Sequence, residues 1–487
     1  MIKIDDRLKS CADLVDGTGT VCDVGTDHAH LCVYLIQANI CSNVIASDVV
    51  DGPLKSAEQT IKRYSLNDKI KLVKSDGLKN IDLHSVSDVI IAGLGGETIL
   101  SIIRNEPLLK TLNISLILQP MTKAPLLRKE LYSDGFEIVK EIPSKVGDTF
   151  YTTMKVSYTG FSTKLPEYTA KIGKVDFNDE LSKEYGLYKV RSLNKLIDSL
   201  KFSNTDYSTL QQIVLKTEKL ATGELFSTLQ DVYSAIDSVA KFSTQEKWDN
   251  SGILIGNPNS KVSKVLVTLD ITNSVIEEAI QGGYDTIVSH HPVIFNPIKS
   301  ILSNSIEYKL IQHGINAICC HTPLDMAKGG INDILYSAFK VPLSLLEDAT
   351  TLEVCTSDGL GFGKIVSTDT TLTPKQIAYV LKDILNCTVV KYINGDRPIK
   401  KIAWCSGSGG SMLEEVLNMG ADAYITGDIK HDRWLYAKDN GISLFDCGHF
   451  HTENIVLPYL RQIIFSTVPN VEVSVANSSC DVVEYAI

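Results

Sequence analysis

Short apolar runs that end in polar or glycine-containing turns recur in two separate parts of the chain, with helical patterns between them. In the first part these runs occupy residues 20–25, 43–49, 69–76, 86–96 and 114–120, and helical spacing occurs at 30–38, 52–65 and 124–135. Such an alternation predicts a parallel sheet covered by helices on both faces. Residues 136–158 have the pattern of two long strands, so we expect an antiparallel hairpin to complete this sheet.

The second part repeats the pattern without copying the first. Its strand-like runs lie at residues 263–272, 284–292, 315–325, 400–410 and 421–428, and its helical segments include 274–283 and 411–420. Between the two parts, residues 161–222 show helical spacing and few strand signals. We therefore expect an α/β protein with a Rossmann-like domain at 1–158, a small helical hairpin at 159–222 and a separate α/β domain at 223–487.

Charge separates the same parts of the 487-residue chain. Residues 1–222 carry 28 basic and 28 acidic side chains, whereas residues 223–487 carry 19 and 30. The acidic excess makes the second part a poor nucleic-acid surface, because phosphate binding depends on Lys and Arg. The first part is not excluded. On composition alone, its helical hairpin is a linker at least as readily as a grip for nucleic acid.

Targeting signals and cysteine frameworks are not evident in the sequence. No apolar run approaches the ~18 residues needed to cross a bilayer, and "MIKIDDRLKS" lacks the apolar core of a signal peptide. The eleven cysteines are scattered, with no CxxC pair. We therefore expect a cytoplasmic protein with no membrane association, no disulfide framework and no thiolate zinc cluster.

Polar residues at the strand ends of the first part predict a cofactor site. Gly25 follows the first strand, where a backbone without a side chain lets amides approach a ligand. Asp48 ends the second strand, 25 residues after Asp23, which suits hydrogen bonds to a ribose diol. Asp76 ends the third strand, near the expected place of an adenine amino group. Gly93 belongs to the glycine-rich turn after the fourth.

Two cofactor classes fit this arrangement. Folds that bind NAD share the diol carboxylate but usually carry a three-glycine fingerprint, which "CDVGTDHAHL" lacks. Enzymes that use S-adenosylmethionine tolerate a looser glycine turn and finish with an antiparallel strand pair. The hairpin expected at 136–158 favours the second class.

The segments "DVGTDHAHL", "ASDVVDGPLKSA", "SDGL", "IAGLGGETI" and "LILQP", in this order, resemble the bacterial tRNA adenine-N1 methyltransferase family that modifies position 22. The resemblance covers about residues 1–222 and implies a class I methyltransferase whose helical hairpin helps to grip tRNA. It implies that Gly25, Asp48 and Asp76 bind S-adenosylmethionine and that Asp27 faces the substrate adenine. His30 stands where the family often has tyrosine. Two alternatives remain: Asp27 caps the following helix, or the substrate is not tRNA.

The adjacent histidines of "TIVSHHPVIF" open the chemistry of the second part. Neighbouring residues on a strand point to opposite sides, so at a strand end His290 and His291 can reach two different ions. Comparable strand ends supply Asp325 in "CCHTPLD", with His321 beside it, and His449 and Glu453 in "DCGHFHTE". The four-residue spacing of the last pair places both side chains on one face of a helical turn. The resulting set contains no thiolate and predicts two divalent ions such as zinc, iron or manganese. Its five members are His290, His291, Asp325, His449 and Glu453.

Seven segments of the second part resemble the NGG-interacting-factor-like dinuclear metal proteins: "WDNSGILIGN", "VTLDIT", "SHHPVIF", "HTPLDMAKGGIND", "SGSGG", "YITGDIKHD" and "GHFHTE". The resemblance covers about 223–487 and implies that the five residues of the set are the ligands. It further implies that Asp325 and Glu453 bridge the ions and that His321 orients a bound water. The family often forms toroidal hexamers, so a homo-oligomer is expected.

The sequence thus predicts a bifunctional enzyme, a tRNA adenine-N1 methyltransferase fused to a hydrolase-like metal domain. Two metal ions can promote hydrolysis of a small molecule or nucleotide, and some members of the second family are labelled GTP cyclohydrolases. The alternative is a non-catalytic metal-binding scaffold that oligomerises or regulates the methyltransferase. "SGSGG" is expected to form a tight turn rather than a phosphate loop, and Asp428 and His431 are candidates for lining the cavity.

Overall fold

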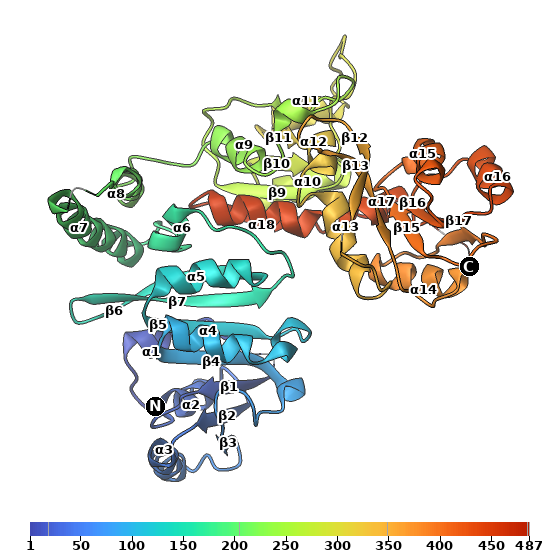
Figure 1. Ribbon diagram of the computed structural model, residues 1–487. Helices are drawn as coiled ribbons and strands as arrows, with labels where there is room; N and C mark the ends of the chain where they lie inside the picture. The colour runs from blue at the N-terminus through green and yellow to red at the C-terminus, as the bar shows by residue number, and fades with distance from the viewer. Residues whose placement is uncertain (18, 204, 348, 485, 487) are drawn as a thin grey trace. The chain divides into compact units, whose positions relative to one another are not determined.

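The chain divides into two compact units in the computed structural model, which describes all residues except 18, 204, 348, 485 and 487. The first unit spans Met1–Phe226 and the second Ser227–Ile487. Each is described on its own (Figure 1). Among the described residues, none of the helices combines the length and the apolar character required to cross a bilayer.

A seven-stranded sheet forms the centre of the first unit, in the order β3-β2-β1-β4-β5-β7-β6. Its strands are β1 (Thr20–Val24), β2 (Asn43–Asp48), β3 (Ile70–Lys74), β4 (Val86–Gly95), β5 (Ser115–Thr122), β6 (Phe136–Val146) and β7 (Thr149–Tyr158). The first five are parallel, and the β6–β7 hairpin joins them antiparallel through the β5–β7 pairing. The order reverses at β1, and open sheets bind ligands at such a switch point.

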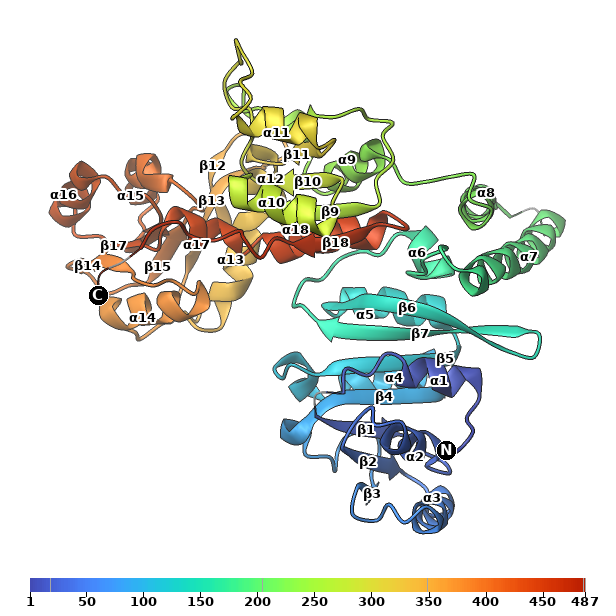
Figure 2. The same cartoon turned by 180° about the vertical axis from the view of Figure 1, so that it is seen from behind.

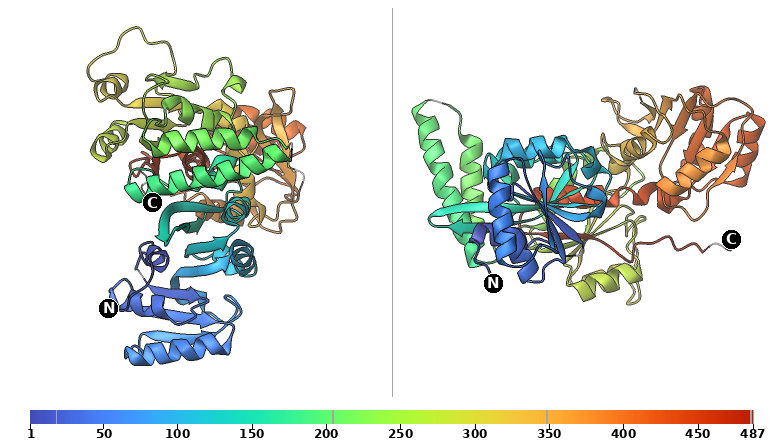
Figure 3. Two further views of the ribbon diagram at one scale, coloured as in Figure 1. Left: turned by 90° about the vertical axis from the view of Figure 1, so that its left-hand side faces the viewer. Right: turned by 90° about the horizontal axis from the view of Figure 1, so that it is seen from below.

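Helices cover both faces of this sheet (Figure 3). They are α1 (Asp6–Ala12), α2 (His30–Gln37), α3 (Asp51–Arg63), α4 (Gly96–Arg104) and α5 (Ala124–Ser133). Strand alternation divides the core: Ile90 packs with the α1–α3 side, whereas Val89 and Ile91 pack with the α4–α5 side. These two apolar layers hold the strand ends, and therefore any bound ligand, in fixed positions.

A helical extension completes the first unit. It consists of α6 (Glu167–Ile172), α7 (Glu180–Phe202) and α8 (Ser208–Ala221), and the last two run side by side as a hairpin (Figure 3). A buried ion pair ties it to the sheet domain. Arg128 on α5 lies 2.6 Å from Glu141 on β6 and also donates to the carbonyl oxygen of Ala170 at 2.7 Å. Glu141 in turn accepts a hydrogen bond from the Lys174 backbone at 2.8 Å.

Two sheets lie within the second unit. The first has the order β18-β9-β10-β11-β8 and the second β12-β13-β15-β16-β17-β14. Their strands are β8 (Gly252–Ile255), β9 (Lys264–Thr268), β10 (Thr286–Ser289), β11 (Asn316–Cys319), β12 (Thr350–Val354), β13 (Gly361–Ser367), β14 (Lys391–Ile393), β15 (Lys401–Trp404), β16 (Ala423–Thr426), β17 (Ser443–Asp446) and β18 (Glu472–Val475). In the first sheet β18, β9, β10 and β11 are parallel and β8 is antiparallel. In the second sheet the parallel strands β15, β16 and β17 lie at the centre, with antiparallel pairings to β13 and β14 on either side.

Ten helices of the second unit connect and cover these sheets in the described part of the chain. They are α9 (Leu229–Asp237), α10 (Asn273–Gly282), α11 (Ile306–Gln312), α12 (Thr322–Met326), α13 (Ile331–Lys340), α14 (Pro374–Ile384), α15 (Leu413–Asn418), α16 (His431–Asp439), α17 (His449–Asn454) and α18 (Leu457–Thr467). The apolar α18 packs beside β9 and β18 (Figure 2). The short α17 follows β17 directly and begins with the predicted ligand His449.

The predicted fold class is confirmed: the protein is α/β, with a Rossmann-like unit followed by a separate α/β unit. Several details differ from the sequence prediction. The pattern of 315–325 predicts one strand with a polar turn, but β11 ends at Cys319 and Thr322–Met326 forms α12. The prediction also omitted α1 and α4, and the antiparallel strands β12–β14.

The Arg128–Glu141 pair gives a test of how the helical extension is held. We expect Arg128→Ala to destabilise the first unit by about 3–5 kcal/mol, because it leaves a buried carboxylate without its partner. Arg104→Ala removes half-exposed pairs with Glu130 and Asp134 and should cost about 0–1 kcal/mol for each pair. Urea unfolding of the full-length protein, followed by hydrogen exchange of β6 and β7, measures both. Equal effects of the two substitutions would refute the assigned role.

Candidate functional site

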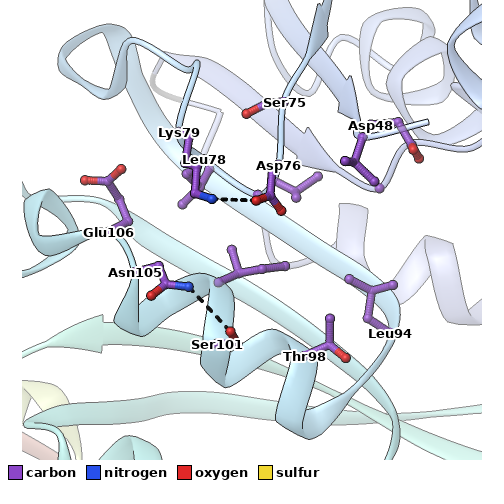
Figure 4. Close-up of a pocket in the computed structure, with 15 residues that line it drawn as sticks. Asp48, Ser75, Asp76, Leu78, Lys79, Leu94, Thr98, Ser101, Asn105 and Glu106 are labelled. Atoms are coloured by element: carbon purple, nitrogen blue, oxygen red, sulfur yellow. Dashed lines mark hydrogen bonds and ion pairs between the residues drawn. The ribbon is translucent and has the colours of Figure 1, made fainter. Parts of the chain in front are cut away.

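A pocket of about 320 Å³ opens at the carboxyl ends of β1, β2 and β3 in the first unit. Gly25 follows β1, Asp48 ends β2 and Asp76 follows β3, so three neighbouring strands contribute to one wall. Leu94 from the end of β4 and Thr98 from α4 line the opposite side (Figure 4). Because the strands are parallel, their polar ends meet at this edge, as is usual for ligand sites of open sheets.

The loop after β1 is held by a buried carboxylate. Asp23 accepts hydrogen bonds from Thr26 Oγ1 at 2.7 Å and from Cys32 Sγ at 3.2 Å. Burial raises the pKa of Asp23, and these two hydrogen bonds partly offset the rise. Gly25 has φ +79°, a left-handed conformation that glycine adopts without strain. The loop therefore turns sharply next to the pocket, with its position fixed from within.

The predicted residues of the first unit do not all line this pocket. Gly25, Asp48 and Asp76 do, whereas Gly93 and Asp27 are outside its lining. The exposed Asp76 carboxylate lies 2.5 Å from Lys79 Nζ. Gly93 has φ +79° and donates its backbone N–H to Gln119 Oε1 at 3.1 Å. Gly93 thus lies within β4, where the pairing with β5 is irregular, and not in a turn after the strand.

Asp27 is exposed and lies in the same loop as Gly25. Its carboxylate lies 3.6 Å from His28 Nε2, and its φ of +47° is unusual for a residue with a side chain. The helix-cap alternative is wrong, because Ala29 occupies the N-cap of α2 and no side chain caps that helix. Ala29 also has a positive φ of +56°. Such strained residues concentrate at functional sites.

A polar network that joins Gly93 of β4 to Gln119 of β5 and Arg7 of α1 could not be found from the sequence. Arg7 on α1 donates through Nη1 to Gln119 Oε1 at 2.8 Å, the same oxygen that accepts from Gly93. Gln119 is fully buried at the end of β5. The motif "LILQP" contains this residue but does not reveal its partners. The link to Arg7, 112 residues away, has no local sequence signal.

In the second unit, the carboxyl ends of both sheets bring the five predicted metal ligands together. His290 and His291 follow β10, and Asp325 lies on α12 after β11. His449 and Glu453 lie one helical turn apart on α17, after β17 of the other sheet. Glu453 Oε2 lies 3.0 Å from His291 Nε2, 3.0 Å from His449 Nε2 and 3.7 Å from His290 Nε2.

Each imidazole of the site is anchored through its Nδ1 atom. His291 and His449 are held at 2.8 Å by the carboxylates of Asp270 and Asp428. His290 is held at 2.9 Å by the Cys320 carbonyl oxygen. Because these acceptors require an N–H at Nδ1, the neutral rings present their lone pairs at Nε2. Asp270 and Asp428 thus orient the rings of His291 and His449, as carboxylates commonly do for histidines that bind metal ions.

Two buried atoms at the centre fit a cation. His290 Nε2 and Glu453 Oε2 have no hydrogen-bond partner among the described residues, although both are inaccessible to solvent. Unpartnered buried polar atoms are costly and rare. A positive ion between them would satisfy both the imidazole lone pair and the carboxylate. Nitrogen and carboxylate donors suit zinc, iron or manganese.

Without a metal ion, the carboxylates around the site favour the protonated form of His291 and His449, and a bound cation would take the place of those protons on Nε2. Burial opposes the charged form of His291, but Asp270 and Glu453 outweigh it and raise its pKa to about 10. For His449, Glu453 and Asp428 likewise outweigh burial and raise the pKa to about 9. Burial opposes ionisation of Glu453, but the surrounding imidazoles hold its pKa well below the usual range. The carboxylate is therefore ionised at neutral pH.

The donor atoms fall into three groups, each with separations of at most 4.8 Å, a little over twice a typical ~2.0–2.2 Å bond to zinc. The groups are His290–Asp325–Glu453, His291–His449–Glu453 and His290–His291–His321. His290, His291 and Glu453 each belong to two of them, and of these three Glu453 carries a carboxylate, the group that can bridge two ions. Asp325 belongs to one only, so its expected bridging role lacks this support.

His321 resembles the other three histidines more closely than the sequence indicated. Its Nδ1 is held at 2.8 Å by the buried carboxylate of Asp249. Its ring centroid lies 5.2 Å from that of His290 and 5.6 Å from that of His291. The ring is therefore oriented as a donor toward the same centre, although sequence reasoning gave it only an indirect role.

The "SGSGG" segment forms a turn that supports the carboxylates. Ser406 Oγ donates to Asp325 Oδ1 at 3.1 Å, and Gly407 N donates to Thr452 Oγ1 at 3.0 Å. A Cβ on Gly407 would lie 2.2 Å from Glu453 Oε1, so only glycine fits there. The predicted turn is present, and its role is to let the backbone approach Glu453. Of the two candidate cavity residues, Asp428 contacts His449, whereas His431 is exposed at the start of α16.

Comparisons with known proteins agree with the division into two units. A family model described as Duf34/NIF3 (NGG1p interacting factor 3) matches residues 227–481, and a methyltransferase-domain model matches residues 4–154. A GTP cyclohydrolase 1 type 2 homolog of Clostridium perfringens is 30% identical over 234 residues, covering 47% of this chain and 88% of that protein. NGG1-interacting factor 3 of Saccharomyces cerevisiae is 31% identical over 273 residues, covering 50% and 94%.

A solved structure of M. capricolum TrmK in complex with S-adenosyl-homocysteine is also similar to this chain. It shares 26% sequence identity, covers 45% of this chain and 98% of its own, and gives a TM-score of 0.38.

Gly407 gives a test of how the centre is built. We expect Gly407→Ala to weaken binding of Co²⁺, because the new methyl group displaces Glu453. Gly420→Ala is the matched control: its φ of +76° imposes similar backbone strain, about 1 kcal/mol, but nothing lies within 4 Å of its Cβ. Cobalt absorbance measures binding, and tryptophan fluorescence during urea unfolding measures stability. Equal cobalt affinity in both variants would contradict this account.

Proposed function

The chain belongs to the Duf34/NIF3 family and carries a methyltransferase domain ahead of it, and from these two assignments we propose that it combines two catalytic activities. The first unit methylates an adenine N1 of tRNA. The second is a dinuclear-metal hydrolase that acts on a small phosphorylated or heterocyclic substrate. The observation that carries the second proposal is the convergence of anchored imidazoles on the buried Glu453.

The pocket of the first unit supports S-adenosylmethionine as its cofactor. Asp48 is placed at a strand end to accept hydrogen bonds from a ribose diol, and Asp76 to accept one from an adenine amino group. The left-handed turn at Gly25 leaves open space where a side chain would stand, so a ligand can approach the backbone of this loop closely. When bound, the cofactor supplies a methyl group on a sulfonium. The chain's task is to hold that group and the acceptor in line.

Support for an adenine acceptor comes from the exposed carboxylate of Asp27. Adenine N1 carries its own lone pair and needs no base, but positive charge develops on the ring as the methyl group is transferred. Asp27 would accept a hydrogen bond from the exocyclic amine, which orients the base and stabilises that charge. The order of the five motifs of the first unit also supports this family of substrates.

The helical hairpin is the proposed contact for tRNA. Both α7 and α8 expose basic side chains, namely Arg191, Lys195, Lys201 and Lys219. Contacts to phosphates need such residues. The buried Arg128–Glu141 pair fixes the extension to the methyltransferase domain, so RNA bound there would be held in register with the pocket.

In the second unit, the proposed ligands are His290, His291, Asp325, His449 and Glu453, with Glu453 bridging. Two divalent cations in such a site activate water and polarise a phosphoryl or ring-carbon electrophile. The residues of the chain contribute anchored donors, exclude bulk water from Glu453 and keep its carboxylate ionised. The name of the Clostridium relative makes GTP the first substrate to assay.

We expect Asp48→Ala to weaken binding of S-adenosylhomocysteine by about 10- to 100-fold, since each charge-assisted hydrogen bond contributes about 1.5–3 kcal/mol. Asp51→Ala is the control, because that exposed carboxylate pairs with Lys74 and does not line the pocket. Isothermal titration calorimetry gives both affinities.

For the acceptor, Asp27→Asn should leave cofactor affinity unchanged and lower the yield of N1-methyladenosine in tRNA measured by mass spectrometry. Normal methylation by the variant would remove Asp27 from the mechanism.

We expect the purified protein to bind two equivalents of Mn²⁺ or Zn²⁺ and to hydrolyse a nucleotide or phosphoester only when loaded. Glu453→Gln should lose both ions, because one carboxylate serves two donor groups. His313→Ala, at an exposed histidine outside these groups, should lose none. Elemental analysis and a substrate screen measure these outcomes. Stoichiometric metal without turnover, together with loss of oligomers on removing this unit, would favour a scaffold instead.

A further inference from the structure

Two exposed aromatic rings stand beside the histidine cluster of the second unit. Trp248 is 57% exposed and Phe295 is 47% exposed, and their ring centroids lie 6.2 Å apart. His321 lies 5.9 Å from Trp248 and 6.5 Å from Phe295. A row of rings thus runs from His290 and His291, through His321, to this aromatic pair.

The backbone that carries the pair is held in place from both sides. Asn250 Nδ2 donates to the Ile294 carbonyl oxygen at 2.6 Å, which joins the loop of Trp248 to the loop of Phe295. Asp249, adjacent to Trp248, holds His321 Nδ1 at 2.8 Å and Thr322 Oγ1 at 2.6 Å. The same hydrogen bonds therefore orient a donor of the candidate metal centre and position the neighbouring tryptophan.

The uncovered ring surface is suited to stacking. The planes of Trp248 and Phe295 are 46° apart, and His321 meets them at 78° and 74°, so none of the three stacks face to face with another. Large aromatic side chains gain free energy when their faces are covered. Leaving two of them exposed beside a polar centre is the arrangement expected of a binding site.

We propose that Trp248 and Phe295 bind the planar heteroaromatic ring of a small ligand whose phosphate or carbonyl oxygens reach the adjacent histidine–carboxylate centre, as in a nucleoside monophosphate. This proposal rests on the metal-dependent function proposed above and names the class of its substrate. The apolar stacking surface and the histidine–carboxylate centre lie one imidazole apart, so a ligand needs both a flat ring and oxygen donors to use them together.

Ring stacking and metal binding can be tested separately on the full-length, Mn²⁺-loaded protein. Guanosine 5′-monophosphate is the probe, and ribose 5-phosphate, which lacks the base, is the matched ligand. We expect the nucleotide to bind about 10- to 100-fold more tightly, because stacking on an aromatic side chain contributes that much per base. Trp248→Ala and Phe295→Ala should reduce this ratio while metal content and the affinity for ribose 5-phosphate stay unchanged.

Fluorescence places the base independently of affinity. The chain has three tryptophans, of which Trp404 is fully buried and Trp434 packs partly buried against the core of the second sheet. The nucleotide should quench the emission of Trp248, and the quenching should disappear in Trp248→Phe, which keeps a ring for stacking. Tyr379→Ala, at an exposed aromatic on α14, is the control and should change neither affinity nor quenching.

The outcomes distinguish this proposal from the metal function. Two bound ions with equal affinities for the two ligands, or a ratio insensitive to Trp248→Ala and Phe295→Ala, would overturn the ring site and leave the metal site standing. Absence of bound metal would overturn the metal function and this proposal with it. Dissociation of an oligomer by Trp248→Ala in analytical ultracentrifugation would identify the pair as a contact between copies of the chain, which also overturns the proposal.

Discussion

The organisation of the second unit depends on hydrogen bonds to Nδ1 of its histidines. An imidazole whose Nδ1 donates to a fixed acceptor can offer a lone pair only at Nε2 and in only one direction. Asp270, Asp428 and Asp249 fix three rings in this way, and the Cys320 carbonyl fixes the fourth. Each acceptor is at or near the end of a strand, so the geometry of the centre is set by the two sheets and not by flexible loops.

Burial of Glu453 follows from the same geometry. Its carboxylate is enclosed by histidines from both sheets and by the close backbone approach at Gly407. An isolated carboxylate in such surroundings would be protonated, because desolvation penalises its charge. The imidazoles reverse that preference and keep it anionic. The centre therefore keeps a buried anionic carboxylate, whose charge a bound metal ion would neutralise.

Much of this could be predicted from the sequence because both sites lie at strand ends. The apolar runs predict the strands, and the residues at their carboxyl ends lie at the ligand-binding edges of the sheets. Gly25 and Asp48 lie at such an edge in the first unit, and His290 lies at one in the second. What the sequence could not supply was the pairing of distant side chains. Asp249 and His321 are 72 residues apart, and Arg7 and Gln119 are 112 apart, so neither pair leaves a local pattern. The alternative that Asp27 caps a helix fails for a similar reason, because two left-handed residues delay the start of α2 until His30.

The buried contact between Arg128 and Glu141 shows how much of the chain after the last strand belongs with the sheet of the first unit. The guanidinium donates a hydrogen bond to the Ala170 carbonyl, and the carboxylate accepts one from the backbone N–H of Lys174. Both of these residues lie beyond the last strand of the sheet. A fragment that ends after β7 lacks the Ala170 carbonyl and the Lys174 amide that contact the ion pair, and it exposes the apolar surface that α6 covers. A boundary at residue 154, where the methyltransferase match ends, would also divide β7, whereas a cut after α8 preserves every one of these contacts.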